Sequence, residues 1–165
     1  MKQIFVNADK CTACKSCEIA CAVQHSKGKT LFSAIMEEPA PLKRIFVETD
    51  GETKMPVICR HCEDAPCLNA CISGCLYRDE KGFVRRKKER CIGCYTCIMV
   101  CPFGVITMDK TKHIAVKCDR CHKLEIPACV NACPTGSLML KELDDFLKEK
   151  HKQAVESAAV KAAAL

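Results

Sequence analysis

The chain has 165 residues, enough for one compact unit or two small lobes. Aromatic residues make up only 5% of it and tryptophan is absent, which excludes a large conventional hydrophobic core. The seventeen cysteines indicate a disulfide scaffold or a metal protein, and the formal net charge is +6.

The predicted elements are short until the last one. In chain order, we expect a strand at 3–6, a polar, turn-like stretch at 22–30, a helix at 31–38, strands at 43–48 and 54–58, hairpins at 76–86 and 105–116, and a strand at 137–140. The hairpin turns are expected at Asp50-Gly51, at Lys81-Gly82 and near 109–112.

Residues 141–165 contain neither glycine nor proline and are predicted to form one amphipathic helix about 36 Å long. Its apolar stripe consists of Leu143, Phe146, Leu147, Ala154, Val155, Ala158 and Ala159. Because an isolated helix of this length is only marginally stable, the stripe needs a cover: its own domain, a second copy or another subunit.

Sixteen of the cysteines fall into four groups of four. The groups are Cys11, Cys14, Cys17 and Cys21; Cys59, Cys62, Cys67 and Cys71; Cys91, Cys94, Cys97 and Cys101; and Cys118, Cys121, Cys129 and Cys133. The third group, followed by Pro102, matches the C-x2-C-x2-C-x3-C-P run of bacterial ferredoxins, in which three thiolates hold one cluster and the fourth holds another. We expect a positive φ at Gly93, beside the cluster. Four ligands per cubane predict four 4Fe–4S clusters.

Metal binding is favoured over disulfides because the C-x2-C repeats suit ligation and seventeen is an odd number. The chain opens without an apolar signal region, so we expect it to stay in the cytoplasm, where thiols remain reduced. No apolar run approaches about 18 residues, so no membrane span is expected. Four clusters would bring a charge of roughly −8, so the basic excess is read as compensation for cluster charge and no nucleic-acid binding is expected.

The spacing leaves open which groups pair. Groups two and three are separated by 19 residues between their facing cysteines, and groups three and four by 16. Either separation would suit a small two-cluster ferredoxin.

Three segments carry a family resemblance: residues 60–67, 99–104 and 116–121. They resemble the four-cluster, ferredoxin-like electron-transfer subunits that accompany molybdopterin enzymes, formate hydrogenlyase and carbon monoxide dehydrogenase. The resemblance implies an α+β fold of two bacterial-ferredoxin-like dicluster modules, one nested in the other, with a C-terminal helix. The implied boundaries are 1–58 plus 109–140 for the outer module, 59–108 for the inner module and 141–165 for the helix.

The resemblance also implies the four ligand sets. Set A is Cys11, Cys14, Cys17 and Cys133; set B is Cys21, Cys118, Cys121 and Cys129; set C is Cys59, Cys62, Cys67 and Cys101; and set D is Cys71, Cys91, Cys94 and Cys97. Residues 25–26, 31–39 and 71–75 look most like the iron–sulfur partner of carbon monoxide dehydrogenase.

Several features also have simpler interpretations. Group four could hold zinc through four thiolates, although the Pro134-Thr-Gly136 that follows it and the need of group one for a partner cysteine argue against zinc. The leftover Cys75 is expected to be a small buried residue rather than a ligand. His61 and His122 lie inside cluster loops and are expected to contact cluster sulfur rather than to ligate iron. The basic run 85–88 is either a docking patch or a solvated hairpin face.

The chain shows no arrangement of catalytic residues, so we expect an electron-transfer subunit without a catalytic site of its own. The favoured interpretation is a relay of single electrons from carbon monoxide dehydrogenase to a hydrogenase or another acceptor. The alternatives are a subunit of a formate dehydrogenase, hydrogenase or molybdopterin complex, or, from another class, a free polyferredoxin or an iron–sulfur sensor. The helix at 141–165 is expected at a subunit interface, and any membrane association is expected to come through the partner.

Overall fold

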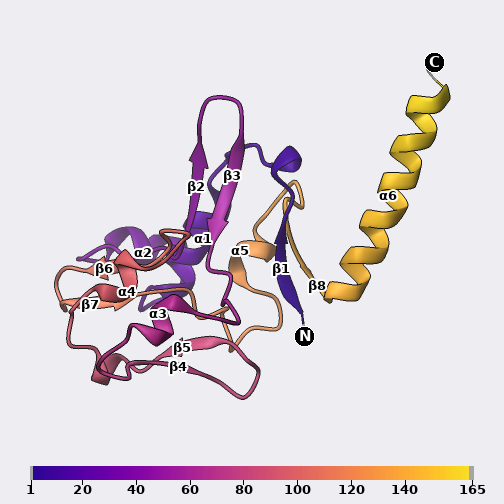
Figure 1. Ribbon diagram of the computed structural model, residues 1–165. Coiled ribbons are helices and arrows are strands. Elements are labelled where there is room, and N and C mark those ends of the chain that lie inside the picture. Colours follow the sequence, from indigo (N-terminus) through magenta and orange to yellow (C-terminus); the bar gives the residue numbers. More distant parts are fainter. Residues whose placement is uncertain (1, 164–165) are drawn as a thin grey trace.

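The computed structural model describes residues 2–163, which form short strands, short helices and one long helix (Figure 1). The strands are β1 (Gln3–Val6), β2 (Ile45–Thr49), β3 (Lys54–Ile58), β4 (Leu76–Arg78), β5 (Val84–Arg86), β6 (Thr107–Asp109), β7 (Ile114–Val116) and β8 (Leu138–Lys141). The α-helices are α1 (Ser16–His25), α2 (Leu31–Met36), α3 (Pro66–Asn69), α4 (Thr96–Met99), α5 (Ala128–Asn131) and α6 (Leu143–Ala163), and 3₁₀ turns are η1 (Ala8–Lys10) and η2 (Lys88–Arg90). This small mixed α and β structure agrees with the expected class.

Each strand of the described chain pairs with one antiparallel partner. Three of the pairs are local hairpins, β2–β3, β4–β5 and β6–β7, as the sequence predicts. The turns form where short polar side chains accept backbone N–H groups: Asp50 Oδ1 accepts from Thr53 at 2.7 Å and Asp109 Oδ1 from Lys112 at 3.0 Å.

The fourth pair joins the two ends of the cluster-binding region. β1 pairs with β8, in a register that runs from Gln3 opposite Lys141 to Val6 opposite Leu138. The last strand therefore spans 138–141 instead of the predicted 137–140, and the last helix begins at Leu143 instead of residue 141.

The stretch at 22–30 corrects one expectation. Residues 22–25 are not a turn but the last part of α1, and Ser26 closes the helix through a 2.7 Å hydrogen bond from its hydroxyl to the Val23 carbonyl. Gln24 and His25 are polar residues in the final turn of α1, so this part of the sequence resembles a turn more than a helix.

Two hydrophobic clusters make up the core. The first combines Ile4, Ile45, Val47, Ile58 and Leu138 with cysteines of groups one and four. The second combines Ala65, Leu76, Val84, Ile106 and Ala115 with cysteines of groups two and three. Most of the apolar packing therefore surrounds the cysteines, as the scarcity of aromatic residues suggests. The nested division into modules stays a prediction.

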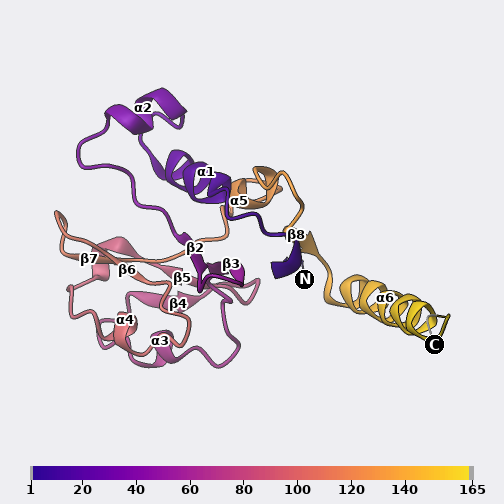
Figure 2. The ribbon, with the colours of Figure 1, turned by 90° about the horizontal axis from the view of Figure 1, so that it is seen from above.

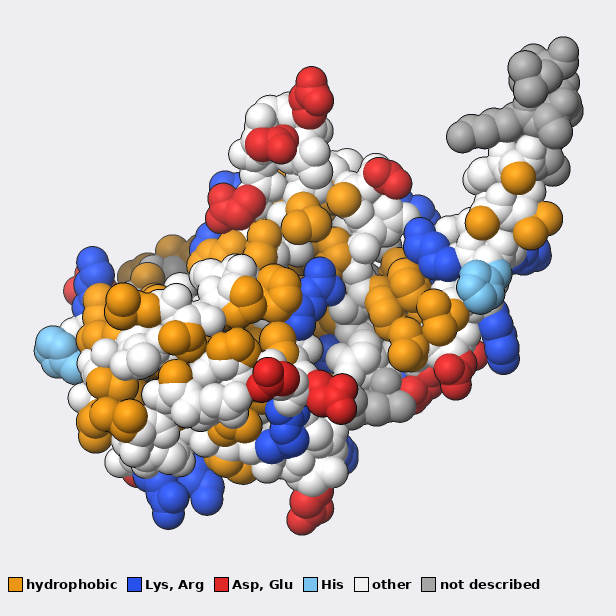
Figure 3. Space-filling model, in the orientation of Figure 1, with side chains coloured by type: hydrophobic (Ala, Val, Ile, Leu, Met, Phe, Trp, Pro, Cys, Tyr) orange, Lys and Arg blue, Asp and Glu red, His pale blue; other side chains and the backbone are white. Residues whose placement is uncertain are grey.

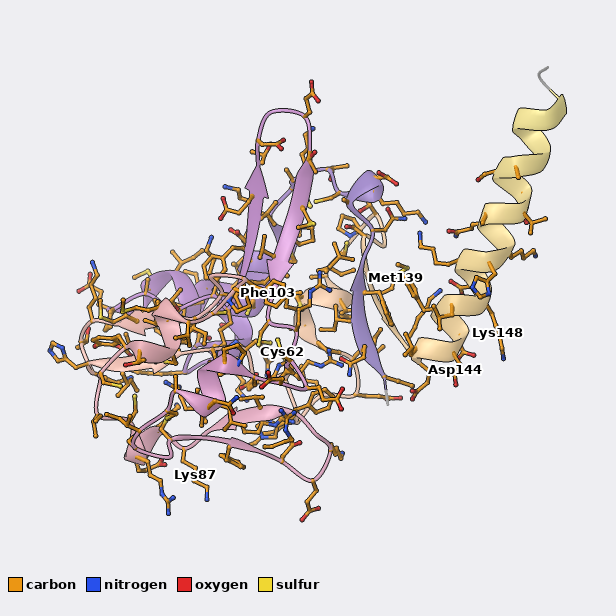
Figure 4. All side chains as sticks on the ribbon, in the orientation of Figure 1. Cys62, Lys87, Phe103, Met139, Asp144 and Lys148 are labelled. Atoms are coloured by element: carbon orange, nitrogen blue, oxygen red, sulfur yellow. The ribbon has the colours of Figure 1, made fainter. Side chains whose placement is uncertain are left out.

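Helix α6 projects away from the rest of the chain (Figures 1 and 2). Its base is held by the Phe146 ring, which stacks on the ring of Phe5 in β1 with centroids 3.9 Å apart, and by an ion pair between Lys141 and Glu149. Apolar side chains gather at this base, beside β1 and β8, where Met139 also lies (Figures 3 and 4).

Up to residue 158, the last whose side chain the structure describes, the apolar stripe of the helix is largely open to solvent. Leu143, Leu147 and Val155 of the predicted stripe are 52%, 43% and 70% exposed, and Ala154 and Ala158 are exposed as well. The side chain of Ala159 and residues 164–165 lie outside the described residues. Among the described helices, none combines the length and the apolar character needed to cross a membrane.

Candidate iron–sulfur sites

The four cysteine loops share one backbone feature. The residue before the second cysteine of each group has a positive φ: 56° at Ala13, 49° at His61, 70° at Gly93 and 61° at Arg120. Such a left-handed residue turns successive N–H groups toward one side, which suits sulfur atoms that carry negative charge. The expectation at Gly93 is confirmed, and the structure extends it to three residues that are not glycine.

Gly93 has a second reason to be glycine. A Cβ at this position would lie 2.4 Å from the carbonyl oxygen of His113, which belongs to the neighbouring hairpin. Only a residue without a side chain lets the loop approach β6–β7 this closely.

Three cavities of similar size, formed by the described residues, each contain the four cysteines of one predicted set in their wall, and the set D cavity is also lined by Cys75. The cavity of about 340 Å³ has set C in its wall, the one of about 350 Å³ has set D, and the one of about 290 Å³ has set A. Cys62 and Phe103, labelled in Figure 4, both line the first of these. Of the four set members in each cavity, three come from one sequence group and one from another: Cys101 joins group two, Cys71 joins group three and Cys133 joins group one.

The cysteines of set B are buried together. Burial raises the pKa of Cys129, and the neighbouring thiols of Cys118, Cys21 and Cys121 raise it further. Because Cys133 lines the set A cavity, the four cysteines of group four do not face one cavity, and a zinc site made of that group alone is disfavoured.

The donor set fits 4Fe–4S clusters. All seventeen cysteines, which lie within the described chain, are free thiols, and soft sulfur ligands are those that iron–sulfur clusters require. Backbone N–H groups already point at three of the sulfurs: Arg44 N lies 3.2 Å from Cys21 Sγ, Leu76 N 3.4 Å from Cys71 Sγ and Arg120 N 3.4 Å from Cys118 Sγ. Such bonds stabilise a negatively charged sulfur. The assignment of each cysteine to a cluster stays a prediction.

A buried histidine supports the same fit. His61 lines the cavity of set C and is 6% exposed, yet neither of its ring nitrogens has a hydrogen-bond partner among the described residues. Burial lowers the pKa of His61 to about 2, and the charges of Lys117, Arg120 and Arg85 add to that shift, so the ring is neutral. An unpaired buried N–H is costly, and a cluster sulfur in the cavity would accept it. His122, by contrast, is exposed.

Cys75 has a polar counterpart elsewhere in the chain. Its thiol donates to the Lys87 carbonyl at 3.1 Å and its carbonyl accepts from Lys87 N at 2.9 Å. Ser137 makes the same two bonds with Asn7, at 2.7 Å and 2.8 Å. Each pair joins the residue before a strand, β4 or β8, to the residue before a 3₁₀ turn that leads into a cysteine loop. Cys75 also touches the set D cavity, and its role as a non-ligand stays a prediction.

The sequence analysis missed a polar network beside set B. The two ring nitrogens of His25 face acceptor oxygens: Nδ1 lies 2.7 Å from the Cys21 carbonyl oxygen and Nε2 lies 3.2 Å from an Asp119 carboxylate oxygen. Asp119 also pairs with Arg44 at 2.6 Å. Burial alone would raise the pKa of Asp119, but the bond from His25 and the charge of Arg44 outweigh it and hold that pKa well below its usual range. No sequence signal reveals this network, because His25 and Asp119 are 94 positions apart.

The basic run 85–88 divides between two roles. The Arg85 side chain is bonded to Asp79 at 2.6 Å and to the Asp119 carbonyl, and Arg86 is bonded to the Ala115 carbonyl. Lys87 projects outward over the ring of Tyr77 (Figure 4), and Lys88 is exposed. The two arginines therefore brace loops, whereas the two lysines face solvent.

Contacts between cysteines link the four sets in series. The second hydrophobic cluster contains cysteines of sets C and D, and the first contains those of sets A and B together with Cys59 of set C. Cys59 is accordingly one of the groups that raise the pKa of buried Cys118 in set B. These contacts link set D to set C, set C to set B and set B to set A. Within this series the two exposed ligand candidates, Cys94 and Cys14, belong to the two end sets.

Comparison with known proteins gives matches over most of the chain. A 4Fe–4S dicluster domain matches residues 52–143 and a 4Fe–4S binding domain matches residues 8–24. An "Iron-sulfur protein" of Rhodospirillum rubrum is 41% identical over 87% of this chain and 83% of its own length. The "Electron transport protein HydN" of Escherichia coli is 37% identical over 91% of this chain and 95% of its own. The "Thiosulfate reductase electron transfer subunit PhsB" of Salmonella typhi is 36% identical over 82% of this chain and 73% of its own.

Proposed function

This chain belongs to the family of 4Fe–4S ferredoxin-type electron-transfer subunits, and we propose that it relays single electrons through four 4Fe–4S clusters held by sets A to D. The observation that supports the proposal is the series of contacts between cysteines that links sets D, C, B and A, with exposed Cys94 in set D and exposed Cys14 in set A. A series of redox centres with an accessible member at each end suits entry at one end and exit at the other.

Each bound cluster would supply one-electron redox chemistry, and the residues of the chain would tune and insulate it. The backbone donors at Cys21, Cys71 and Cys118 stabilise charge on sulfur. Neutral His61 lies beside the Cys59 loop and would donate to sulfur in set C. All eight cysteines of sets B and C are buried or half-buried, which keeps water from the inner part of the relay.

As the catalytic partner we propose carbon monoxide dehydrogenase, with electrons passing to a hydrogenase or another acceptor, and with the chain in the cytoplasm and without a catalytic site of its own. The proposal depends on the resemblance of residues 25–26, 31–39 and 71–75. The named relatives include an electron-transport protein and a thiosulfate reductase subunit, so they do not favour carbon monoxide dehydrogenase over a formate dehydrogenase, hydrogenase or molybdopterin enzyme.

We further propose that α6 docks on the neighbouring subunit. The stacking of Phe146 on Phe5 fixes the base of the helix, while Leu147 and Val155 farther along remain exposed. An apolar face that its own domain does not cover is stabilised when a partner buries it. A free polyferredoxin would have no use for such a helix.

Anaerobic co-purification from native extract, followed by mass spectrometry, tests the partner. A carbon monoxide dehydrogenase, hydrogenase or formate dehydrogenase subunit should be recovered in stoichiometric amount. With the isolated partner, the loaded chain should accept electrons only when the partner's substrate is added. Recovery of the chain alone, with four clusters present, would identify a free polyferredoxin instead.

A further inference from the structure

A broad basic groove runs beside the cysteines of set B. It encloses about 1920 Å³, its open mouth included, and lies between the end of α1, the β4–β5 hairpin and the loop at 117–123. Figure 2 shows α1 on one side and β4–β5 on the other. Cys118 and Cys121 are part of the groove wall, so the groove reaches the predicted ligands of one cluster.

The groove contains the whole formal charge excess of the chain. Nine lysines and arginines line it against three acidic residues, Asp79, Glu80 and Asp119, which leaves a formal excess of six. The net charge of the whole chain is also +6, so the remaining lysines and arginines balance the remaining acids. A cluster on set B would contribute roughly −2, so about four positive charges remain after compensation. Compensation of cluster charge therefore does not explain the groove.

The groove cations form two classes. Some are braced inside the fold: Arg44 pairs with Asp119, Arg85 pairs with Asp79, and Lys117 Nζ donates to the Val84 carbonyl at 2.8 Å. These side chains hold the loops around set B in place.

The second class lies at the rim. Lys29, Lys81, Lys88 and Lys123 are exposed, and within residues 2–163 their ammonium groups make no hydrogen bond, ion pair or ring contact. They come from three different segments: the loop after α1, the β4–β5 hairpin with its exit, and the loop after β7. Free ammonium groups on flexible stems are well suited to attracting an acidic surface.

We propose that this groove is the docking surface for an acidic redox protein that exchanges one electron with the cluster on set B. The inference rests on the proposed function, because it requires a cluster held by Cys21, Cys118, Cys121 and Cys129. In each exchange the donor loses one electron and the set B cluster gains it, or the reverse, and no bond forms or breaks. Electrons could then enter or leave the relay at set B as well as at sets A and D.

The shape of the groove favours a protein over a phosphate ligand. The exposed lysines come from three separate segments that line a groove open to solvent. Helix α1 ends at the groove and presents its C-terminus there, whereas phosphate groups are bound by helix N-termini. Charge complementarity over a broad surface is typical of electron-transfer encounters, which are short-lived and steered by long-range attraction.

The test compares two charge-reversal variants of the fully loaded chain. The groove variant is Lys29→Glu, Lys81→Glu, Lys88→Glu and Lys123→Glu. The matched control is Lys54→Glu, Lys110→Glu, Lys148→Glu and Lys152→Glu, four exposed lysines outside the groove that give the same change in net charge. Iron content and full reduction by dithionite are measured first on each protein.

The probe is a reduced acidic plant-type ferredoxin, and anaerobic stopped-flow absorbance gives the second-order rate of electron transfer to each protein. For the wild type we expect the rate to fall at least about tenfold between low and high ionic strength. At low ionic strength the groove variant should be at least about tenfold slower than the wild type, and the control variant within about threefold of it. Reduced cytochrome c is a basic probe of opposite charge. Its dissociation constant should be lower for the groove variant than for the wild type.

Equal slowing of the two variants would assign the effect to net charge and overturn the proposal, and so would an unchanged rate in the groove variant. Loss of binding to a single-stranded RNA probe, with ferredoxin rates unaltered, would assign the groove to nucleic acid and also overturn it. Absence of dithionite-reducible clusters in the wild type is a separate result, because it would overturn the proposed function and this proposal together.

Discussion

The two variants Cys75→Ser and Cys75→Ala should each keep the full complement of about sixteen iron atoms per chain. Cys75 is the one cysteine outside the four sets, although it touches the set D cavity. Its thiol is buried, at 3% exposure, and donates to the Lys87 carbonyl at 3.1 Å. Ser137 shows that a serine hydroxyl makes the equivalent bond to Asn7, so serine should replace Cys75 with little loss.

The expected cost follows from these contacts. Alanine removes one hydrogen bond, worth about 1 kcal/mol, and leaves a small void worth up to about another 1 kcal/mol. For a chain of this length, a loss of about 1.5 kcal/mol lowers the unfolding temperature by about 3–6 °C. Serine should cost less than about 1 kcal/mol, because it keeps the hydrogen bond.

The assay combines anaerobic iron and sulfide analysis, EPR of the reduced protein and an anaerobic thermal melt monitored by cluster absorbance. The matched control is Cys71→Ala, which removes a predicted ligand from the same cavity and should lower the iron content toward about twelve. If Cys75→Ala loses iron as Cys71→Ala does, the reasoning from the Ser137 counterpart is refuted and Cys75 is a ligand.

Three further predictions concern other residues. His61→Leu should keep all the iron but lower the potential of one cluster by about 40 mV, the equivalent of one hydrogen bond of about 1 kcal/mol, in an EPR redox titration; His122→Leu should leave every potential unchanged. Cys133→Ala should perturb the cluster of Cys11, Cys14 and Cys17 and spare that of set B, and the opposite pattern would disprove the pairing. Deletion of residues 150–165 should keep the clusters but weaken co-migration with the partner on gel filtration, and undiminished co-migration would show that α6 has no docking role.

Much of the local structure could be predicted from the sequence, because it depends on residues close together in the chain. The three local hairpins form at the expected turns, where Asp50, Asp109 and Gly82 satisfy the turn geometry. The long final helix follows from the absence of glycine and proline. The end of α1 differs from the predicted turn at 22–30, because the last turn of this helix is polar.

The long-range features could not be derived from spacing. The pairing of β1 with β8 joins opposite ends of the cluster-binding region, and it places Cys133 near the first cysteine loop. The network of His25, Asp119 and Arg44 depends on the same kind of distant contact. Positive φ values at Ala13, His61 and Arg120 carry no sequence signal, because only Gly93 among the four loop positions is a residue that favours them.

The central claim is that the chain holds four one-electron centres. Coulometric titration of the anaerobically purified protein, with iron and zinc measured on the same sample, tests this most directly. The account predicts uptake of about four electrons per chain, with about sixteen iron atoms and no zinc. Uptake of about three electrons with about twelve iron atoms, or one equivalent of bound zinc, would contradict it.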